Sequence, residues 1–216
     1  MMTKIEIVNK YAEFAKQTFI RLKAQFGLGD DVSFTVPTIK GYLAEDYNVR
    51  YKYNCDTVLS VMTEITNDYL LEQSFMFTKY DTFRDGSIYY RIILPKYHIS
   101  EILAGFNNEQ DINAYIEECI KHEIGHVLHA KDIFSIYGKE ETGGFLEGED
   151  IMWLNEYSAF LTMMDRRNYI SEYQYQKECI TKYYSISPES DANKCAGVDV
   201  NKLIELELKV RIGISE

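Results

Sequence analysis

The sequence is short of several features that would assign a protein to a class at once. Only three prolines and one tryptophan occur among 216 residues, and no low-complexity linker divides the chain. It contains no internal repeat and no apolar run of about 18 residues, so neither a repeat protein nor a membrane-spanning protein is expected. A chain of this length with 46% hydrophobic residues can bury a substantial core. We therefore expect one water-soluble domain over residues 1–216.

Cysteine is also scarce and scattered. The four cysteines, Cys55, Cys119, Cys179 and Cys195, form no C-x-x-C pair, which argues against a zinc knuckle built from cysteines and favours reduced thiols. Residues 1–26 have the amphipathic pattern of a helix ended by glycine, and they lack the features of a signal peptide. Both observations predict a cytoplasmic protein.

Positive charge is in short supply as well. The chain has 23 Lys and Arg against 34 Asp and Glu, which gives a net charge of −11. Binding of phosphate backbones relies on clustered basic residues, so nucleic acid is not expected as a partner. The acidic residues are spread along the whole chain, so their main role is expected to be solubility and no substrate follows from them.

The segment His122-Glu123-Ile124-Gly125-His126 carries the most chemical information. Residues i and i+4 share one face of a helix, so its two imidazoles can hold one Zn²⁺ from the same side. Glu123 is rotated by about 100° around the helix and can reach a water on the metal as a general base. Residues 109–134 predict a helix, because apolar side chains recur at helical spacing and Asn107 or Asn108 can cap its start.

This segment resembles the active-site helix of the zincin metallopeptidases, in which two histidines bind zinc and the glutamate activates water. The resemblance covers that helix and little else. It implies that His122 and His126 are zinc ligands, that Glu123 is the general base and proton shuttle, and that each chain binds one Zn²⁺.

A catalytic zinc needs three protein ligands and one open position, so a third ligand must lie downstream. Glu156 is the preferred candidate, because it lies in a predicted helix from about Asp150 to Arg167. This arrangement is similar to the glutamate-type zincins, in which a second helix presents a glutamate after an insertion of variable length. The other candidates are Glu147, Glu149, Asp150, Asp132 and His129.

The chain departs from two zincin patterns. Thermolysin-like enzymes carry an Asp four residues after the ligand glutamate, where it orients a zinc histidine, but that position here is Phe160. Metzincins carry a Gly three residues after the second histidine, but that position here is His129. The partner that orients the zinc histidines is therefore expected elsewhere in the chain.

The resemblance to zincins also implies a Tyr or His that donates to the oxyanion formed during peptide hydrolysis, and this chain offers its tyrosines together with His98 and His129. Among the 18 tyrosines, Tyr157 is the candidate because it lies beside Glu156. Its alternative role is packing with Trp153 and Phe160 in the core. Cys119, one turn before His122, is expected to pack rather than to bind metal.

The pattern along the chain predicts an α+β fold. Residues 1–108 are expected to form an N-terminal helix and a small mixed β-sheet packed on the HExxH helix. Residues 109–216 are expected to form a mainly helical part that carries the zinc ligands. In the first part, strands are predicted at 49–53, 75–80 and 87–94 and a helix at 57–71.

Three local features have a bearing on the substrate site. Ile88 to Leu94 is expected either as an edge strand, where an extended substrate could add, or as part of an ordinary core hairpin. The Gly143-Gly144 stretch is expected as a loop, either mobile or simply connecting. Residues 185–198 are expected as a loop that interrupts the helical C-terminal part.

Together these observations predict a zinc metallopeptidase, expected to be an endopeptidase, that acts on a peptide or protein substrate. One alternative is a zincin-like module that binds zinc and acts in interaction or regulation without cleaving. A purely structural site, however, is normally closed by four protein ligands and needs no adjacent base such as Glu123. The other alternative is a metal-free interaction protein in which the histidines form only a polar helix face.

Overall fold

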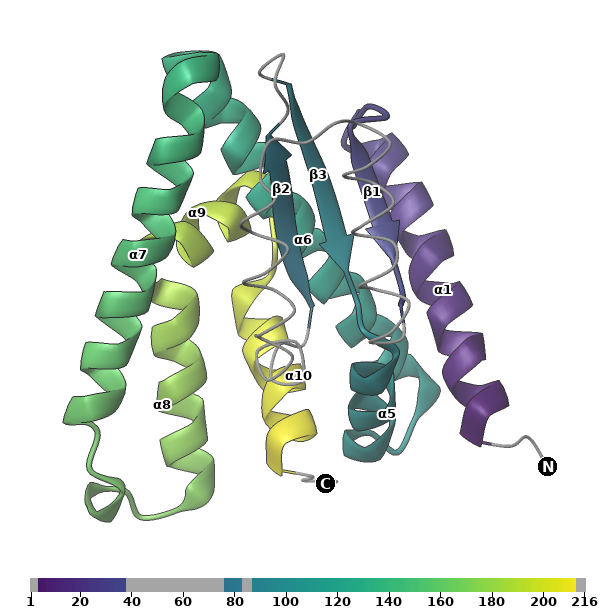
Figure 1. Ribbon diagram of the computed structural model, residues 1–216. Coiled ribbons are helices and arrows are strands. Elements are labelled where there is room, and N and C mark those ends of the chain that lie inside the picture. Colours follow the sequence, from purple (N-terminus) through teal and green to yellow (C-terminus); the bar gives the residue numbers. More distant parts are fainter. Residues whose placement is uncertain (1–3, 38–75, 83–86, 213–216) are drawn as a thin grey trace. The chain divides into compact units, whose positions relative to one another are not determined.

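The computed structural model describes residues 4–37, 76–82 and 87–212, and the chain divides into two compact units, Met1–Ser100 and Glu101–Glu216. The first unit contains one long helix and a three-stranded sheet, and the second is helical (Figure 1). This confirms the predicted α+β class. The strand predicted at 49–53 and the helix predicted at 57–71 lie outside the described residues.

The first unit begins with α1, Lys4–Gln25. Its apolar stripe is buried at Ala15, Phe19 and Leu22. The Phe19 ring stacks on Phe34 of the first strand, with centroids 5.2 Å apart. The helix ends as its sequence predicts, because Gly27 adopts a φ of +64°, a conformation that glycine takes without steric cost.

The sheet consists of β1 (Val32–Thr35), β2 (Phe77–Thr82) and β3 (Ile88–Ile93) in the order β1-β3-β2. β1 runs parallel to β3 with Val32 opposite Tyr90, and β2 runs antiparallel to β3 with Tyr80 opposite Tyr90. The sheet is therefore mixed, as predicted. β3 has hydrogen-bonded neighbours on both sides and forms a hairpin with β2. Of the two alternatives for 88–94, the core hairpin is therefore correct, and no substrate can add to this strand.

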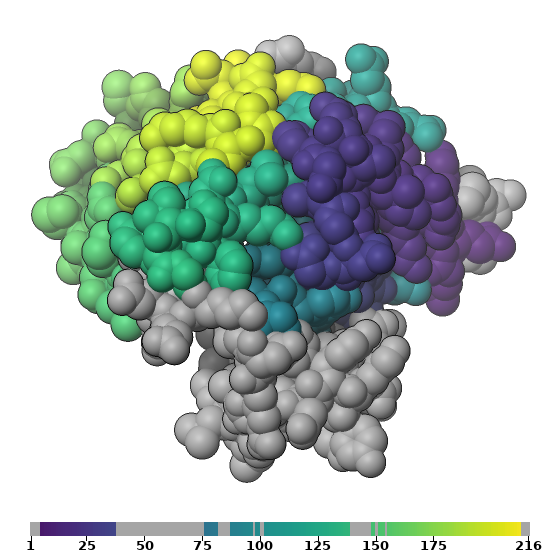
Figure 2. All heavy atoms as spheres, turned by 90° about the horizontal axis from the view of Figure 1, so that it is seen from above, coloured from purple at the N-terminus to yellow at the C-terminus, as the bar shows by residue number. Residues whose placement is uncertain are grey.

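The helix α5 (Lys96–Gly105) leads from the sheet into the helical unit. That unit contains α6 (Glu109–Tyr137), α7 (Lys139–Met163), a short 3₁₀ turn at Arg166–Asn168, α8 (Glu172–Ser185), α9 (Ser187–Ala196) and α10 (Val200–Ile212). In Figure 2 the yellow atoms of the C-terminal helices lie directly beside the teal-green atoms of α6. No helix in the described part of the chain is long and apolar enough to span a membrane.

Two predicted loops are helical. Gly143-Gly144 lies within α7, which begins directly after Gly138, so the loop expected there is wrong. Gly138 makes the sharp turn between α6 and α7 with a φ of +75°. The loop expected at 185–198 is also wrong, because it contains α9, and this second difference decides how the candidate site is completed.

Candidate metal centre

The HExxH segment lies in the middle of α6, as predicted. Asn108 caps the helix by accepting a hydrogen bond from the Asp111 amide at 2.7 Å. The predicted apolar stripe is buried at Ile116, Ile120 and Ile124, which fixes the rotation of the helix about its axis. His122 and Glu123 are buried and His126 is partly buried.

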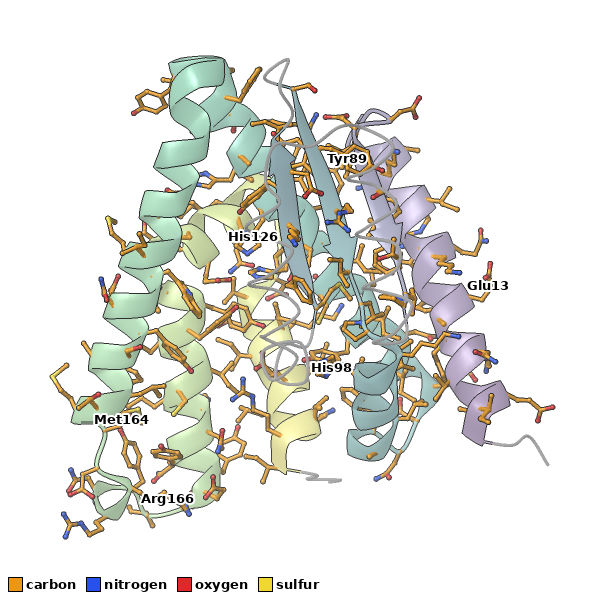
Figure 3. All side chains as sticks on the ribbon, viewed as in Figure 1. Glu13, Tyr89, His98, His126, Met164 and Arg166 are labelled. Atoms are coloured by element: carbon orange, nitrogen blue, oxygen red, sulfur yellow. The ribbon has the colours of Figure 1, made fainter. Side chains whose placement is uncertain are left out.

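The third component comes from α9, which packs closely along α6. Pro188 occupies the first turn of α9, where its missing N–H costs nothing, and Gly197 ends the helix in the left-handed conformation. The close approach depends on Gly125, since a Cβ there would meet the carbonyl oxygen of Ala192 at 2.0 Å. The glycine inside HEIGH therefore lets α9 lie directly against the motif. His126 lies on the side of α6 that faces α9 (Figure 3).

This packing brings Glu189 to the two histidines. Glu189 Oε2 lies 2.9 Å from His122 Nε2 and 3.3 Å from His126 Nε2, and the two Nε2 atoms are 3.3 Å apart. Tetrahedral zinc with bonds of about 2.0–2.1 Å would separate its ligand atoms by about 3.3 Å. Within the described part of the chain, these three residues are the group whose ligand atoms converge in a way that could hold a metal ion.

Asn193 fixes the orientation of one candidate ligand. Its Oδ1 lies 2.8 Å from His122 Nδ1, and it stands one helical turn after Glu189 on α9. When Nδ1 donates to Asn193, the neutral ring presents a lone pair at Nε2. That lone pair then faces the buried Oε2 of Glu189, which is 2.9 Å away. Acceptors that converge in this way require either a proton or a metal cation between them.

The pKa values of His122 and Glu189 show the same need for a positive charge between the acceptors. Burial alone would lower the pKa of His122, but the hydrogen bond to Glu189 and the charge of that carboxylate raise it to about 9. Burial alone would raise the pKa of Glu189, but the charge of His126 and the hydrogen bonds to both histidines hold it well below its usual range. With these two pKa shifts, the cluster holds a proton at neutral pH.

Two further groups surround the cluster. Glu123 is buried directly beside His122, and its negative charge acts on both His122 and Tyr183. Tyr183, in the last turn of α8, forms a hydrogen bond with Glu189. Burial, followed by the charges of Glu189 and Glu123, raises the pKa of the Tyr183 phenol well above its usual value, so it stays protonated and can donate.

The structure does not bring Glu156 to the histidines. Its side chain on α7 is 50% exposed and its Oε1 lies 3.0 Å from Lys182 Nζ. Glu189 occupies the position that was expected of Glu156. The physical reason is that α9 packs directly on the motif, while the face of α7 that bears Glu156 is open to solvent.

Tyr157 is likewise not at the cluster. Its ring stacks with Trp153 and Phe160 on the same helix, at centroid distances of 5.8 and 6.5 Å. It also meets Tyr183 edge-on at 5.6 Å. Tyr157 therefore packs against Tyr183, the tyrosine that contacts Glu189. This is the alternative role expected for it, although the three stacked rings are only partly buried.

Two other ligand candidates pair with one another instead. His129 Nε2 lies 3.1 and 3.0 Å from the two carboxylate oxygens of Glu149, which ties α6 to α7. Asp132 is exposed and outside the cluster, and Cys119 is buried in the helix interface as expected. The side chains of Glu147 and Asp150 fall outside the described part of the chain.

Glu189 and Asn193 were missed because their segment looks like a loop. Ser187-Pro188-Glu189-Ser190-Asp191 is rich in residues that favour turns. Three signals could have identified it: Pro followed by acidic residues at a helix start, Gly197 at its end, and Glu-x-x-x-Asn spacing. That spacing corresponds to the Glu-x-x-x-Asp of thermolysin-like enzymes, with an amide in place of the carboxylate.

Searches against protein-family models, curated proteins and solved structures found no match to this chain. The chemistry of the cluster is therefore the basis on which a function can be assigned.

Proposed function

We propose that this protein is a zinc-dependent metallopeptidase in which His122, His126 and Glu189 bind the metal and Glu123 is the general base. The observation that carries the proposal is the convergence of two imidazole nitrogens and one carboxylate oxygen within 3.3 Å of one another. Two nitrogens and one oxygen form the ligand set of a catalytic zinc, which keeps its fourth position for water or substrate. A cluster built only for structure would have no use for Glu123.

The residues around the cluster can perform hydrolysis of a peptide bond. A bound Zn²⁺ would lower the pKa of its water to about 7 and polarise the substrate carbonyl. Glu123 accepts the proton of the attacking water and then delivers it to the leaving amine. The protonated phenol of Tyr183 can donate a hydrogen bond to the oxyanion, since it already lies within reach of Glu189. Asn193 keeps His122 in the tautomer that presents Nε2 to the metal.

The proposed substrate is a peptide or protein segment, and the proposed location is the cytoplasm. The described cysteines, Cys119, Cys179 and Cys195, are all free thiols, which fits a reducing compartment. A zinc-binding module without catalytic activity is the alternative function, and it shares the metal site but needs neither Glu123 nor Tyr183.

Zinc content and peptide cleavage, measured on one panel of variants, test the proposal. Elemental analysis after zinc reconstitution is expected to find one zinc per chain in wild type, Glu123→Gln, Tyr183→Phe and Glu156→Ala, and a loss of zinc in Glu189→Ala. Cleavage of a mixed peptide library, followed by mass spectrometry, should fall by about 10²–10⁴-fold in Glu123→Gln. It should remain at the wild-type level in Glu156→Ala, the matched control.

The two measurements separate the alternatives. Zinc in the wild type without cleavage of any peptide would favour the non-catalytic module. No zinc in the wild type, even after reconstitution, would exclude both functions. Zinc retained in Glu189→Ala but lost in Glu156→Ala would identify Glu156 on α7 as the third ligand.

A further inference from the structure

A chain of polar contacts, buried at Tyr184 and Glu207, links the C-terminal helix to the candidate ligand His122. It starts at Tyr184 in the last turn of α8, whose ring lies 5.4 Å from the His122 ring, centroid to centroid, at an interplanar angle of 86°. The Tyr184 hydroxyl donates a hydrogen bond of 2.6 Å to Glu207 Oε2 on α10. Glu207 Oε1 accepts from Arg211 Nε at 2.9 Å and from Arg211 Nη2 at 2.5 Å.

The hydrogen bond of His122 to Asn193 leaves the His122 ring free to rotate in one direction. It fixes the tautomer and the direction of Nδ1, but the ring can still tilt about that bond. Tyr184, which is buried, limits this tilt by packing perpendicular to the ring. The orientation of the lone pair at Nε2 therefore depends on where Tyr184 is held.

Glu207 is a charged residue at a buried position of α10. The other buried residues of α10 are apolar: Leu203, Ile204, Leu206 and Leu208. Burying a carboxylate among them has a large desolvation cost, and an apolar side chain of similar volume is often as stable or more so. Both oxygens of Glu207 are used, one by Tyr184 and the other by Arg211. A leucine could accept from neither partner, but Arg211 is partly exposed and water can take the place of its contact with Glu207, whereas the buried Tyr184 hydroxyl depends on Glu207.

We infer that Tyr184 is a positioning residue for the metal ligand His122, and that Glu207 and Arg211 of α10 hold it in place. The inference rests on the proposed metal site. It makes the C-terminal helix part of the metal centre, although α10 supplies no ligand within the described cluster.

A double variant separates positioning from general stability. In Tyr184→Phe/Glu207→Leu both partners of the buried hydrogen bond are replaced by apolar groups, a change that is often nearly neutral for folding. Arg211 is partly exposed and can turn to solvent. The ring at 184 remains but loses its anchor, so zinc affinity is expected to fall about tenfold, as for other groups that orient ligands. Tyr184→Leu, which removes the ring, should lower it by about 10–100-fold.

The measurements are the zinc dissociation constant by chelator competition, the absorption bands of the Co²⁺-substituted protein, and thermal unfolding in EDTA. Lys209→Met is the matched control, because it removes an ion pair of 3.0 Å between α10 and Asp111 of α6 without touching the network. It should leave zinc affinity and the Co²⁺ bands unchanged. The double variant should have shifted Co²⁺ bands and a lower zinc affinity. In EDTA it should unfold at the same temperature as the wild type.

Wild-type zinc affinity and unshifted Co²⁺ bands in both the double variant and Tyr184→Leu would overturn the positioning role and leave the proposed metal site intact. Equal weakening in Lys209→Met would also overturn it, since any loosening of α10 would then suffice. A wild-type protein that binds no zinc would overturn the metal site and this inference together.

Discussion

At the scale of single residues, Asn193 orients one of the candidate ligands. Its neutral amide oxygen lies 2.8 Å from His122 Nδ1 and can accept a hydrogen bond from that nitrogen. Asn193→Ala should weaken zinc binding by about 10–100-fold, because the ring loses its tautomer control. Asn193→Asp should bind zinc at least as tightly as wild type, since a carboxylate makes the imidazole a more basic ligand. Chelator competition measures both values.

Asn155→Ala, a change at an exposed position on α7, is the control and should bind zinc as the wild type does. Equal affinity in wild type and Asn193→Ala would mean that the contact does not orient His122.

The raised pKa of His122 predicts how zinc binding depends on pH. In the metal-free protein this pKa is about 9, because the effect of Glu189 outweighs that of burial. Zinc must displace that proton, so its apparent affinity should rise about tenfold per pH unit between about pH 7 and 9 and then level off. Isothermal titration in buffers of different ionisation enthalpy would count the proton released. An affinity that is constant from pH 7 to 9 would contradict the proton-filled cluster.

The metal-free protein should show the opposite trend. A group whose pKa is raised by folding contributes stability below its ordinary pKa, and this contribution is lost as pH rises through the folded value. The His122–Glu189 pair should therefore stabilise metal-free protein near pH 6 and cease to do so above about pH 9. Urea unfolding in EDTA measures this, and Glu189→Gln should remove the dependence.

At the scale of elements, the site depends on how closely α9 approaches α6. A Cβ at Gly125 would meet backbone atoms of Ala192 at 2.0 and 2.6 Å, so α9 would have to move. Gly125→Ala should therefore destabilise the metal-free protein by about 1–3 kcal/mol and also separate Glu189 from the histidines. Urea unfolding in EDTA and elemental analysis should find both losses.

Gly148→Ala on α7 is the matched control. A Cβ there has nothing within 4 Å, so removing a helical glycine should stabilise the protein by about 0.5–1 kcal/mol and leave zinc binding unchanged. If Gly125→Ala behaved like Gly148→Ala, the close approach would not be needed for the site.

The sequence was informative about elements whose pattern is long and periodic. The helix that carries HEIGH was predicted over 109–134 with Asn107 or Asn108 as its cap, because an apolar stripe repeats along it, and the structure has the helix at Glu109–Tyr137 with Asn108 as the cap. The helix α9 was not predicted, because it has only 10 residues and its side chains are mostly polar. A helix this short is marginal alone and forms through its packing on another element, a contact that its own residues do not encode locally. Glu189, the third member of the candidate site, was missed for that reason.

At the scale of the whole molecule, the α+β class was predictable because periodicities of two and of 3.6 residues occur in different parts of the chain. The order of the strands was not, since the pairing of β1 with β3 joins segments more than 50 residues apart. Nothing local distinguishes a central strand from an edge strand when both are short. For this reason the pattern at 88–94 left an edge strand and a core hairpin equally open, and the structure shows the hairpin.

The division into two units predicts which part of the chain zinc should stabilise against unfolding. His122, His126, Glu189 and the residues that orient them all lie in Glu101–Glu216. Zinc at 1,000 times its dissociation constant stabilises a site by about 4.1 kcal/mol, a factor of about 1,000 in the unfolding equilibrium. Amide hydrogens of α6 and α9 that exchange through unfolding of this unit should therefore slow by up to about 1,000-fold with zinc.

Amides of β1 and β3, in Met1–Ser100, should exchange at the same rate with and without zinc if each unit unfolds by itself. Hydrogen exchange measured by mass spectrometry distinguishes separate unfolding of the two units from joint unfolding. Glu189→Gln is the control and should show no zinc effect in either unit. Equal slowing in β3 and α6 would mean that the units unfold together. In that case the metal would govern the stability of the entire chain, and the sheet would depend on zinc although it contributes no ligand to the described cluster.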